Sequence, residues 1–216
     1  MKAMILAAGR GERMRPLTDS MPKPLLRIGG QTLIEHHIHA LVRAGIRELV
    51  INHAHLGEKL VQALGDGGSY GVQIRWSPEP EGALETGGGI FNALPLLGDA
   101  PFVVLNADIW TDFPFEGLPE QPDGLAHLVL VDNPPHHPQG DFVLDGALIG
   151  AEGSTRYTFS GISAYHSSFF DGLPPGKQAL APLLYAAAAR QQVTGELLQG
   201  EWVDIGTLER LESLNA

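Results

Sequence analysis

The first half of the chain alternates short apolar runs with longer amphipathic stretches. Four apolar runs predict buried strands, at residues 3–8, 48–52, 72–76 and 102–105. Three stretches with apolar residues at helical spacing predict helices, at residues 31–44, 57–64 and 85–94. Thr32 can cap the first helix, Gly45 can end it, and Pro95 can end the third. This alternation predicts right-handed βαβ crossovers in an α/β fold, with a mainly parallel sheet between helices.

The second half has a different pattern. Shorter apolar runs separated by turns predict strands at residues 126–131, 141–144, 147–149, 158–165 and 195–199. Helices are predicted at residues 180–190 and from residue 207 onward. Because we find no internal repeat and no linker, we expect residues 1–216 to form one domain in which this half extends the same sheet.

Polar and glycine-rich segments follow three of the predicted strands. They occupy residues 9–15, 52–55 and 106–108. Ligands of open α/β sheets bind outside the carboxyl ends of the strands. We therefore expect these three segments to converge on one crevice.

The segment after the first strand carries the most specific chemistry. Gly9 and Gly11 would allow backbone N–H groups to approach a polyanion closely. Arg13 offers a planar fork of donors and Lys23 a point charge. A plain strand-to-helix turn is the simpler alternative. A dinucleotide fingerprint would need glycine where Met14 stands, and a Walker loop would need Gly-Lys-Ser/Thr. The pattern favours a nucleoside triphosphate, and the missing third glycine disfavours an NAD-dependent oxidoreductase.

Composition narrows the class of protein. Of the 216 residues, 44% are hydrophobic and 18% charged, as is typical of a soluble globular protein, and the net charge is −11. That charge argues against a nonspecific nucleic-acid partner, yet five of the 14 lysines and arginines lie within the first 27 residues. The absence of cysteine excludes disulfides and zinc–thiolate sites and agrees with a cytoplasmic location. The first apolar run is too short for a membrane span.

Several motifs along the whole chain resemble those of the sugar-1-phosphate nucleotidyltransferases. They are Gly9-x-Gly11-x-Arg13-x-x-Pro16-Leu17-Thr18, Pro22-Lys23-Pro24, Leu84-Glu85-Thr86-Gly87-Gly88-Gly89, Asn106-Ala107-Asp108, Thr158-Phe159-Ser160-Gly161 and Trp202-Val203-Asp204-Ile205-Gly206-Thr207. The Leu84–Gly89 motif is most similar to the branch that acts on N-acetylmuramate 1-phosphate in peptidoglycan recycling. The resemblance implies a Rossmann-like mixed, mostly parallel sheet sandwiched by helices, with a nucleotide-binding half at about 1–110 and a sugar-binding half at about 111–216.

The resemblance also implies an activity and its residues. UTP and a sugar 1-phosphate would give a UDP-sugar and pyrophosphate in a monomer or weak homodimer, with Mg²⁺ held by Asp108 and Asp204. Arg13, Lys23 and Asp108 would be catalytic. The nucleotide would contact Leu6, Ala7, Ala8, Gly9, Arg10, Gly11, Glu12, Arg13, Lys23, Glu85, Thr86, Gly87 and Asn106. The sugar would contact Asn106, Asp141, Glu152 and Gly161.

Simpler interpretations of these residues stay open. Asp108 and Asp204 could be turn or cap residues, and the Glu85–Gly89 segment could be a helix start with glycines for close packing. Asp141, Glu152 and Gly161 could belong to a strand edge, a loop and a bulge. The nine histidines receive no role.

Other activities also stay open. One is transfer to a different sugar 1-phosphate or from dTTP or GTP, and another is a sensor that binds a nucleotide sugar without turnover. Related enzymes often carry a lysine where this chain has Ala179, the nearest lysine here being Lys177.

Overall fold

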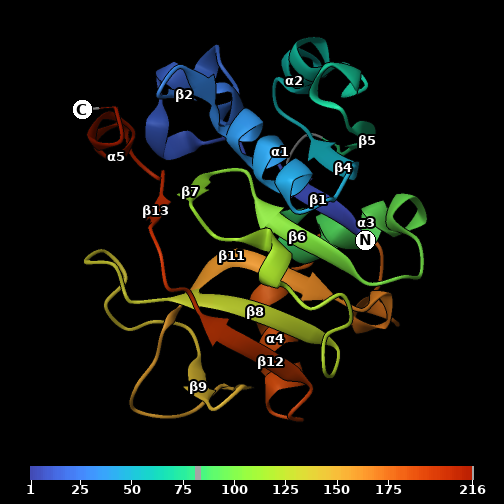
Figure 1. The fold of residues 1–216 in the computed structure, drawn as a ribbon, viewed down its shortest axis with the longest axis vertical. Helices are drawn as coiled ribbons and strands as arrows, with labels where there is room; N and C mark the ends of the chain where they lie inside the picture. The colour runs from blue at the N-terminus through green and yellow to red at the C-terminus, as the bar shows by residue number, and fades with distance from the viewer. Residues whose placement is uncertain (81–83, 216) are drawn as a thin grey trace.

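The computed structural model describes residues 1–80 and 84–215, which are arranged around one nine-stranded sheet (Figure 1). Its strands, in spatial order, are β5 (Gln73–Pro78), β4 (Glu48–His53), β1 (Lys2–Leu6), β6 (Phe102–Asn106), β11 (Thr158–Tyr165), β8 (Ala126–Val131), β12 (Val193–Leu197), β10 (Leu148–Gly150) and β9 (Val143–Asp145). β11 and β10 run antiparallel to their neighbours, and the other strands share one direction. The predicted mixed, mostly parallel sheet is confirmed.

The register of the sheet aligns the carboxyl ends of β1, β4 and β6. Leu6, the last residue of β1, pairs with Asn52 of β4 on one side and with Asn106 of β6 on the other. The three segments that follow these strands therefore leave the sheet at the same edge.

Helices cover both faces of the sheet. α1 (Leu33–Arg43) and α2 (Gly57–Leu64) pack on one face, and α3 (Glu85–Leu97) and α4 (Leu180–Ala188) pack on the other (Figure 1). Alternate residues of β1 separate accordingly, with Ala3 and Ile5 buried in the α1 side of the core and Met4 in the α3 side. A central strand buried on both faces explains the continuous apolar run in the sequence.

The structure confirms the predicted start of one helix and contradicts the predicted end of another. The Thr32 cap is confirmed, because its hydroxyl accepts from Glu35 N and the Glu35 carboxylate accepts from Thr32 N. The predicted end of the third helix at Pro95 is wrong. Pro95 lies inside α3, whose last residue is Leu97. Gly98 caps the helix with φ of 85°. Pro95 occupies the last turn, where little of the helix follows it, so its missing N–H costs one hydrogen bond without ending the helix.

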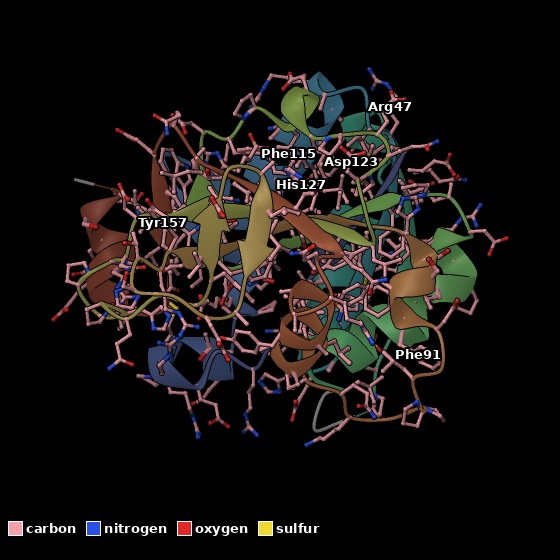
Figure 2. All side chains as sticks on the ribbon, turned by 90° about the horizontal axis from the view of Figure 1, so that it is seen from below. Arg47, Phe91, Phe115, Asp123, His127 and Tyr157 are labelled. Carbon is pink, nitrogen blue, oxygen red and sulfur yellow. The ribbon has the colours of Figure 1, made fainter. Side chains whose placement is uncertain are left out.

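The hydrophobic pattern of the sequence does not predict four short strands that the structure contains. β7 (Ile109–Thr111) pairs with β13 (Trp202–Asp204), and β2 (Arg27–Ile28) pairs with β3 (Gln31–Thr32). β12 begins at Val193 rather than at the predicted residue 195, and it pairs with β8. The Nδ1 atom of His127 in β8, labelled in Figure 2, lies 2.9 Å from the Oγ1 atom of Thr194 in β12.

The last helix, α5 (Leu208–Ser213), packs against the segment that follows β1 (Figure 1). Leu211 of this helix shares a buried apolar cluster with Met14, Leu26 and Ile205. Asn215 Nδ2 donates to Arg27 O at 3.0 Å. None of the helices in residues 1–80 and 84–215 is long and apolar enough to cross a membrane.

Candidate active site

A cavity of about 460 Å³ lies at the carboxyl ends of β1, β4 and β6. Its lining consists of Leu6, Ala7, Ala8, Gly9, Gly11, Glu12, Arg13, Met14, Lys23, Pro24, Asn52, Glu79, Glu85, Thr86, Asn106, Ala107, Asp108 and Gly206. These residues come from five separate regions of the chain, which the sheet brings to one edge.

The loop after β1 makes a tight turn around Gly11. Gly11 has φ of 68°, a left-handed conformation that glycine adopts without strain. Its carbonyl accepts from Met14 N at 2.9 Å and from Thr18 Oγ1 at 2.8 Å. A methyl group at this position would lie 3.0 Å from Thr18 Cγ2. The turn thus needs glycine for both conformation and space.

Arg13 packs against the C-terminal motif. A methyl group on Gly206 would lie 3.0 Å from Arg13 Nη2 and 3.1 Å from its Cζ. A side chain at 206 would therefore have to shift the guanidinium by a few tenths of an ångström. The position of Arg13 thus depends on a residue far away in the sequence.

Lys23 and Asp108 form an ion pair at the floor of the cavity. Lys23 Nζ donates to Asp108 Oδ2 at 2.7 Å. The lysine is 7% exposed, whereas the aspartate side chain keeps 41% of its surface exposed. A buried ammonium needs its anionic partner, so the pair fixes Lys23 while the carboxylate stays accessible to a ligand.

Asp204 lies beside Asp108 because β13 pairs with β7. Ile205 N donates to Asp108 O at 2.9 Å. The Asp204 carboxylate accepts from Arg210 Nη1 at 2.7 Å and lies 3.2 Å from His136 Nε2, and it does not line the cavity. Within the described parts of the chain, no group of three or more His, Cys, Asp or Glu side chains could hold a metal ion. Two neighbouring carboxylates suit Mg²⁺, which takes its other ligands from phosphate and water.

A chain of hydrogen bonds joins the loop after β1 to the start of α3. Ala7 N donates to Asn52 Oδ1 at 2.7 Å, and Asn52 Nδ2 donates to Glu79 Oε1 at 2.6 Å. Glu79 Oε2 accepts from Leu84 N at 2.9 Å. A methyl group on Gly89 would lie 2.6 Å from Glu79 Oε1, so glycine lets α3 approach this pair. The network fixes the two walls between which a flat base would lie.

A second cavity of about 440 Å³ adjoins the first. The two share Glu85, Thr86 and Asn106. The remaining lining is largely apolar and consists of Asp141, Phe142, Phe159, Ala179, Leu180, Ala181, Leu184 and Tyr185. Two contiguous cavities can hold two reactants side by side.

Asn106 stands at the junction because of Gly161. Gly161 is buried with φ of 84°, and a methyl group there would lie 2.6 Å from Asn106 Nδ2. Asp141 Oδ1 is 3.0 Å from His137 Nε2, and Asp141 Oδ2 accepts from Phe159 N at 2.8 Å. Gly161 thus supports Asn106 from behind the lining, while Asp141 is itself a lining residue held by His137 and Phe159 N.

The sequence comparisons agree with this geometry. The model of the nucleotidyl transferase family matches residues 2–142. The N-acetylmuramate alpha-1-phosphate uridylyltransferase of Neisseria meningitidis is 51% identical over 225 residues, which cover 100% of this chain and 97% of that protein. The chain belongs to the nucleotidyl transferase family. The Caulobacter vibrioides protein of the same name is 33% identical to it, over 94% of this chain and 91% of that protein.

A solved structure with the same fold supports the architecture. A putative glucose-1-phosphate thymidylyltransferase from Bacillus anthracis superposes with a TM-score of 0.87 at 24% identity, covering 100% of this chain and 94% of that chain. At this level of identity, the likeness concerns the fold alone.

The structure brings most of the predicted nucleotide contacts of this nucleotidyl transferase together. Predicted residues in the first cavity are Leu6, Ala7, Ala8, Gly9, Gly11, Glu12, Arg13, Lys23, Glu85, Thr86, Asn106 and Asp108. Arg10 is exposed and lies outside the lining. Gly87 is buried against the segment before α4, where a methyl group would lie 2.9 Å from Gln178 O. Gly87 is therefore closely packed and lies outside the lining of the first cavity, and its contact with the nucleotide stays a prediction.

The predicted sugar contacts divide in the same way. Asn106 and Asp141 line the second cavity, while Glu152 is exposed and Gly161 is buried, both outside the lining. The predicted convergence of the segments 9–15, 52–55 and 106–108 is confirmed, and it includes Asn52. Sequence reasoning missed Glu79, which directly follows β5. It also missed the apolar wall of the second cavity, because Leu184 and Tyr185 are indistinguishable from core residues in a helix.

Gly206→Ala is expected to weaken UTP binding by roughly tenfold, on the scale of one charge-assisted hydrogen bond to phosphate. The added methyl group would displace the Arg13 guanidinium. Isothermal titration with UTP measures the effect. Gly117→Ala is the matched control, since no atom in the described part of the chain lies within 4 Å of a methyl group there. Unchanged UTP affinity in Gly206→Ala would contradict this role of the glycine.

His37 should make stability depend on pH. It is 3% exposed beneath the loop that carries Asp108, and burial, with a smaller effect of His36, lowers its pKa from 6.5 to about 4. Between these values the unfolded chain binds a proton that the native state does not, so stability falls as the pH falls. From pH 7 to pH 5, wild type should lose about 2 kcal/mol more than His37→Gln. Urea unfolding at both pH values tests this, and equal losses would refute it.

Proposed function

We propose that this nucleotidyl transferase transfers the uridylyl group of UTP to N-acetylmuramate 1-phosphate, giving the UDP-sugar and pyrophosphate. The observation that supports it most is the pair of contiguous cavities. The first carries Arg13, Lys23 and the phosphate loop, and the second is a largely apolar chamber joined to it at Asn106. The 51% identity to the meningococcal uridylyltransferase supports the choice of substrates.

The proposed reaction is a direct displacement. A phosphate oxygen of the sugar 1-phosphate attacks the α-phosphorus of UTP in line with the departing pyrophosphate. The attacking group is already an anion, so no general base is required. Catalysis then consists of positioning and charge neutralisation. Lys23 would act at the α-phosphate and the incoming sugar phosphate, and Arg13 at the β- and γ-phosphates.

We further propose that Asp108 and Asp204 hold Mg²⁺ together with phosphate oxygens of UTP. The ion would supply positive charge to the triphosphate. Asp108 lines the cavity and keeps a large part of its side chain exposed, whereas Asp204 is restrained by Arg210. The pairing of β13 with β7 supports this proposal because it brings Asp204 near Asp108, although only Asp108 lines the cavity.

Measuring pyrophosphate release over a matrix of substrates tests the proposed function. UTP, dTTP, CTP and GTP are each combined with the 1-phosphates of N-acetylmuramate, N-acetylglucosamine, glucose and mannose. UTP with N-acetylmuramate 1-phosphate should give the highest kcat/KM. Higher activity with glucose 1-phosphate or with GTP would overturn the proposed substrates. Binding without turnover of any pair would favour a nucleotide-sugar sensor.

A further inference from the structure

Arg156 stands next to the second cavity without being part of its lining. It precedes Tyr157, which bridges to Phe142 on the cavity wall. The Arg156 guanidinium donates from Nη2 to the main-chain carbonyl of Asp141, and Tyr185 Oη donates to the same oxygen at 3.4 Å. Both Asp141 and Tyr185 line the cavity. The positive charge of Arg156 therefore lies directly behind its wall.

The hydrogen-bonding capacity of this guanidinium is largely unused. Its Nε is buried and has no hydrogen-bond partner among the residues that the structure describes. Throughout residues 1–80 and 84–215, no carboxylate forms an ion pair with Arg156. A guanidinium carries five N–H donors, and a half-buried one without an anion loses solvation that nothing replaces. Such an arrangement indicates that a ligand supplies the missing anion.

The surrounding charges point the same way. The lining of the second cavity contains Glu85 and Asp141 and neither lysine nor arginine. The Asp141 carboxylate is already bonded to His137 and to Phe159 N. Arg156 and Lys177 both lie outside the lining, but Lys177 is exposed, whereas half-buried Arg156 donates to the main chain of Asp141, a lining residue. An anionic substituent in this chamber would thus need Arg156 as its counterion.

We propose that Arg156 is a specificity-determining residue that selects sugar 1-phosphates bearing a carboxylate. Its planar fork suits a carboxylate, which can accept two parallel hydrogen bonds. The inference rests on the proposed function, because N-acetylmuramate differs from N-acetylglucosamine by a lactyl group that ends in a carboxylate. Arg156 would act on recognition of the sugar and leave the transfer step itself unchanged.

The test compares Arg156→Gln with wild type on three acceptors, using UTP throughout. They are N-acetylmuramate 1-phosphate, its lactyl carboxamide and N-acetylglucosamine 1-phosphate. For the carboxylate substrate, kcat/KM should fall by roughly ten- to a hundredfold, the range of one charge-assisted contact, mainly through KM. For the two acceptors that lack the carboxylate, kcat/KM should stay within about twofold of wild type. Arg190→Gln, at an exposed arginine after α4, is the matched control and should change nothing.

The outcomes separate this proposal from the proposed function. An equal loss on all three acceptors would mean that Arg156 is merely structural, and would overturn the inference. Equal use of carboxylate and carboxamide by wild type would also overturn it. Failure of wild type to use N-acetylmuramate 1-phosphate at all would refute the proposed function instead. Thermal unfolding checks that Arg156→Gln folds. If it does not fold, Arg156→Lys takes its place in the test. The ratio of kcat/KM for the carboxylate substrate to kcat/KM for the carboxamide should then be lower than in wild type.

Discussion

Asp108→Asn is expected to lower kcat by at least roughly a hundredfold, the usual cost of losing a main stabiliser of transition-state charge. Two effects combine in this variant. The proposed metal ligand loses its charge, and Lys23, 7% exposed, loses the anion that lies 2.7 Å from its ammonium group. Steady-state kinetics with saturating UTP measure the loss.

The control for this variant is Asp123→Asn, which removes an exposed carboxylate outside both cavities (Figure 2). It should retain the wild-type kcat. Metal removal provides an independent check, because excess chelator should abolish activity and added Mg²⁺ should restore it. Full activity in the presence of chelator would refute the proposed role of the metal.

Lys23→Ala is expected to lower kcat by roughly a hundredfold or more while weakening UTP binding much less. The charge at the α-phosphate rearranges during transfer, so a cation placed there stabilises the transition state more than bound UTP. Comparing kcat with the Kd from a direct UTP titration separates the two effects. A rise in KM alone would show that Lys23 contributes uniform binding.

Lys177→Ala is the matched control for this variant, since it removes an exposed lysine outside both cavities. The double variant Lys23→Ala, Asp108→Asn adds a further test. Because the two side chains form one ion pair, their effects should not add. Strict additivity would mean that the pair does not act as a unit.

The local elements could be predicted because their signals are local. Ala3, Met4 and Ile5 form a continuous apolar run because β1 is covered on both faces. Thr32 and Glu35 cap α1 through contacts only three residues apart. Gly11 adopts its left-handed turn within the loop that contains it. In each case a short segment carries both the pattern and its physical cause.

The contacts that position Arg13 and Asn106 follow from the tertiary structure alone. Arg13 rests on Gly206, and Asn106 on Gly161, because these glycines leave space for side chains from distant segments. The two glycines carry no local sign of which side chain each one accommodates. The sequence pattern placed Gly161 and Glu152 at the sugar, whereas the structure places one behind Asn106 and the other in an exposed segment.

The sequence by itself determined the fold class, the phosphate loop and the identity of the cations and carboxylates. Only the tertiary structure decided how they are partnered. Lys23 and Asp108 are 85 residues apart, and the three-residue pairing of β13 with β7 brings Asp204 near Asp108. Such pairings depend on strand order and packing across the whole sheet, whereas hydrophobic periodicity reports only the environment of each segment. The partners of Arg13, Asp141 and Arg156 therefore emerge only when the chain is folded.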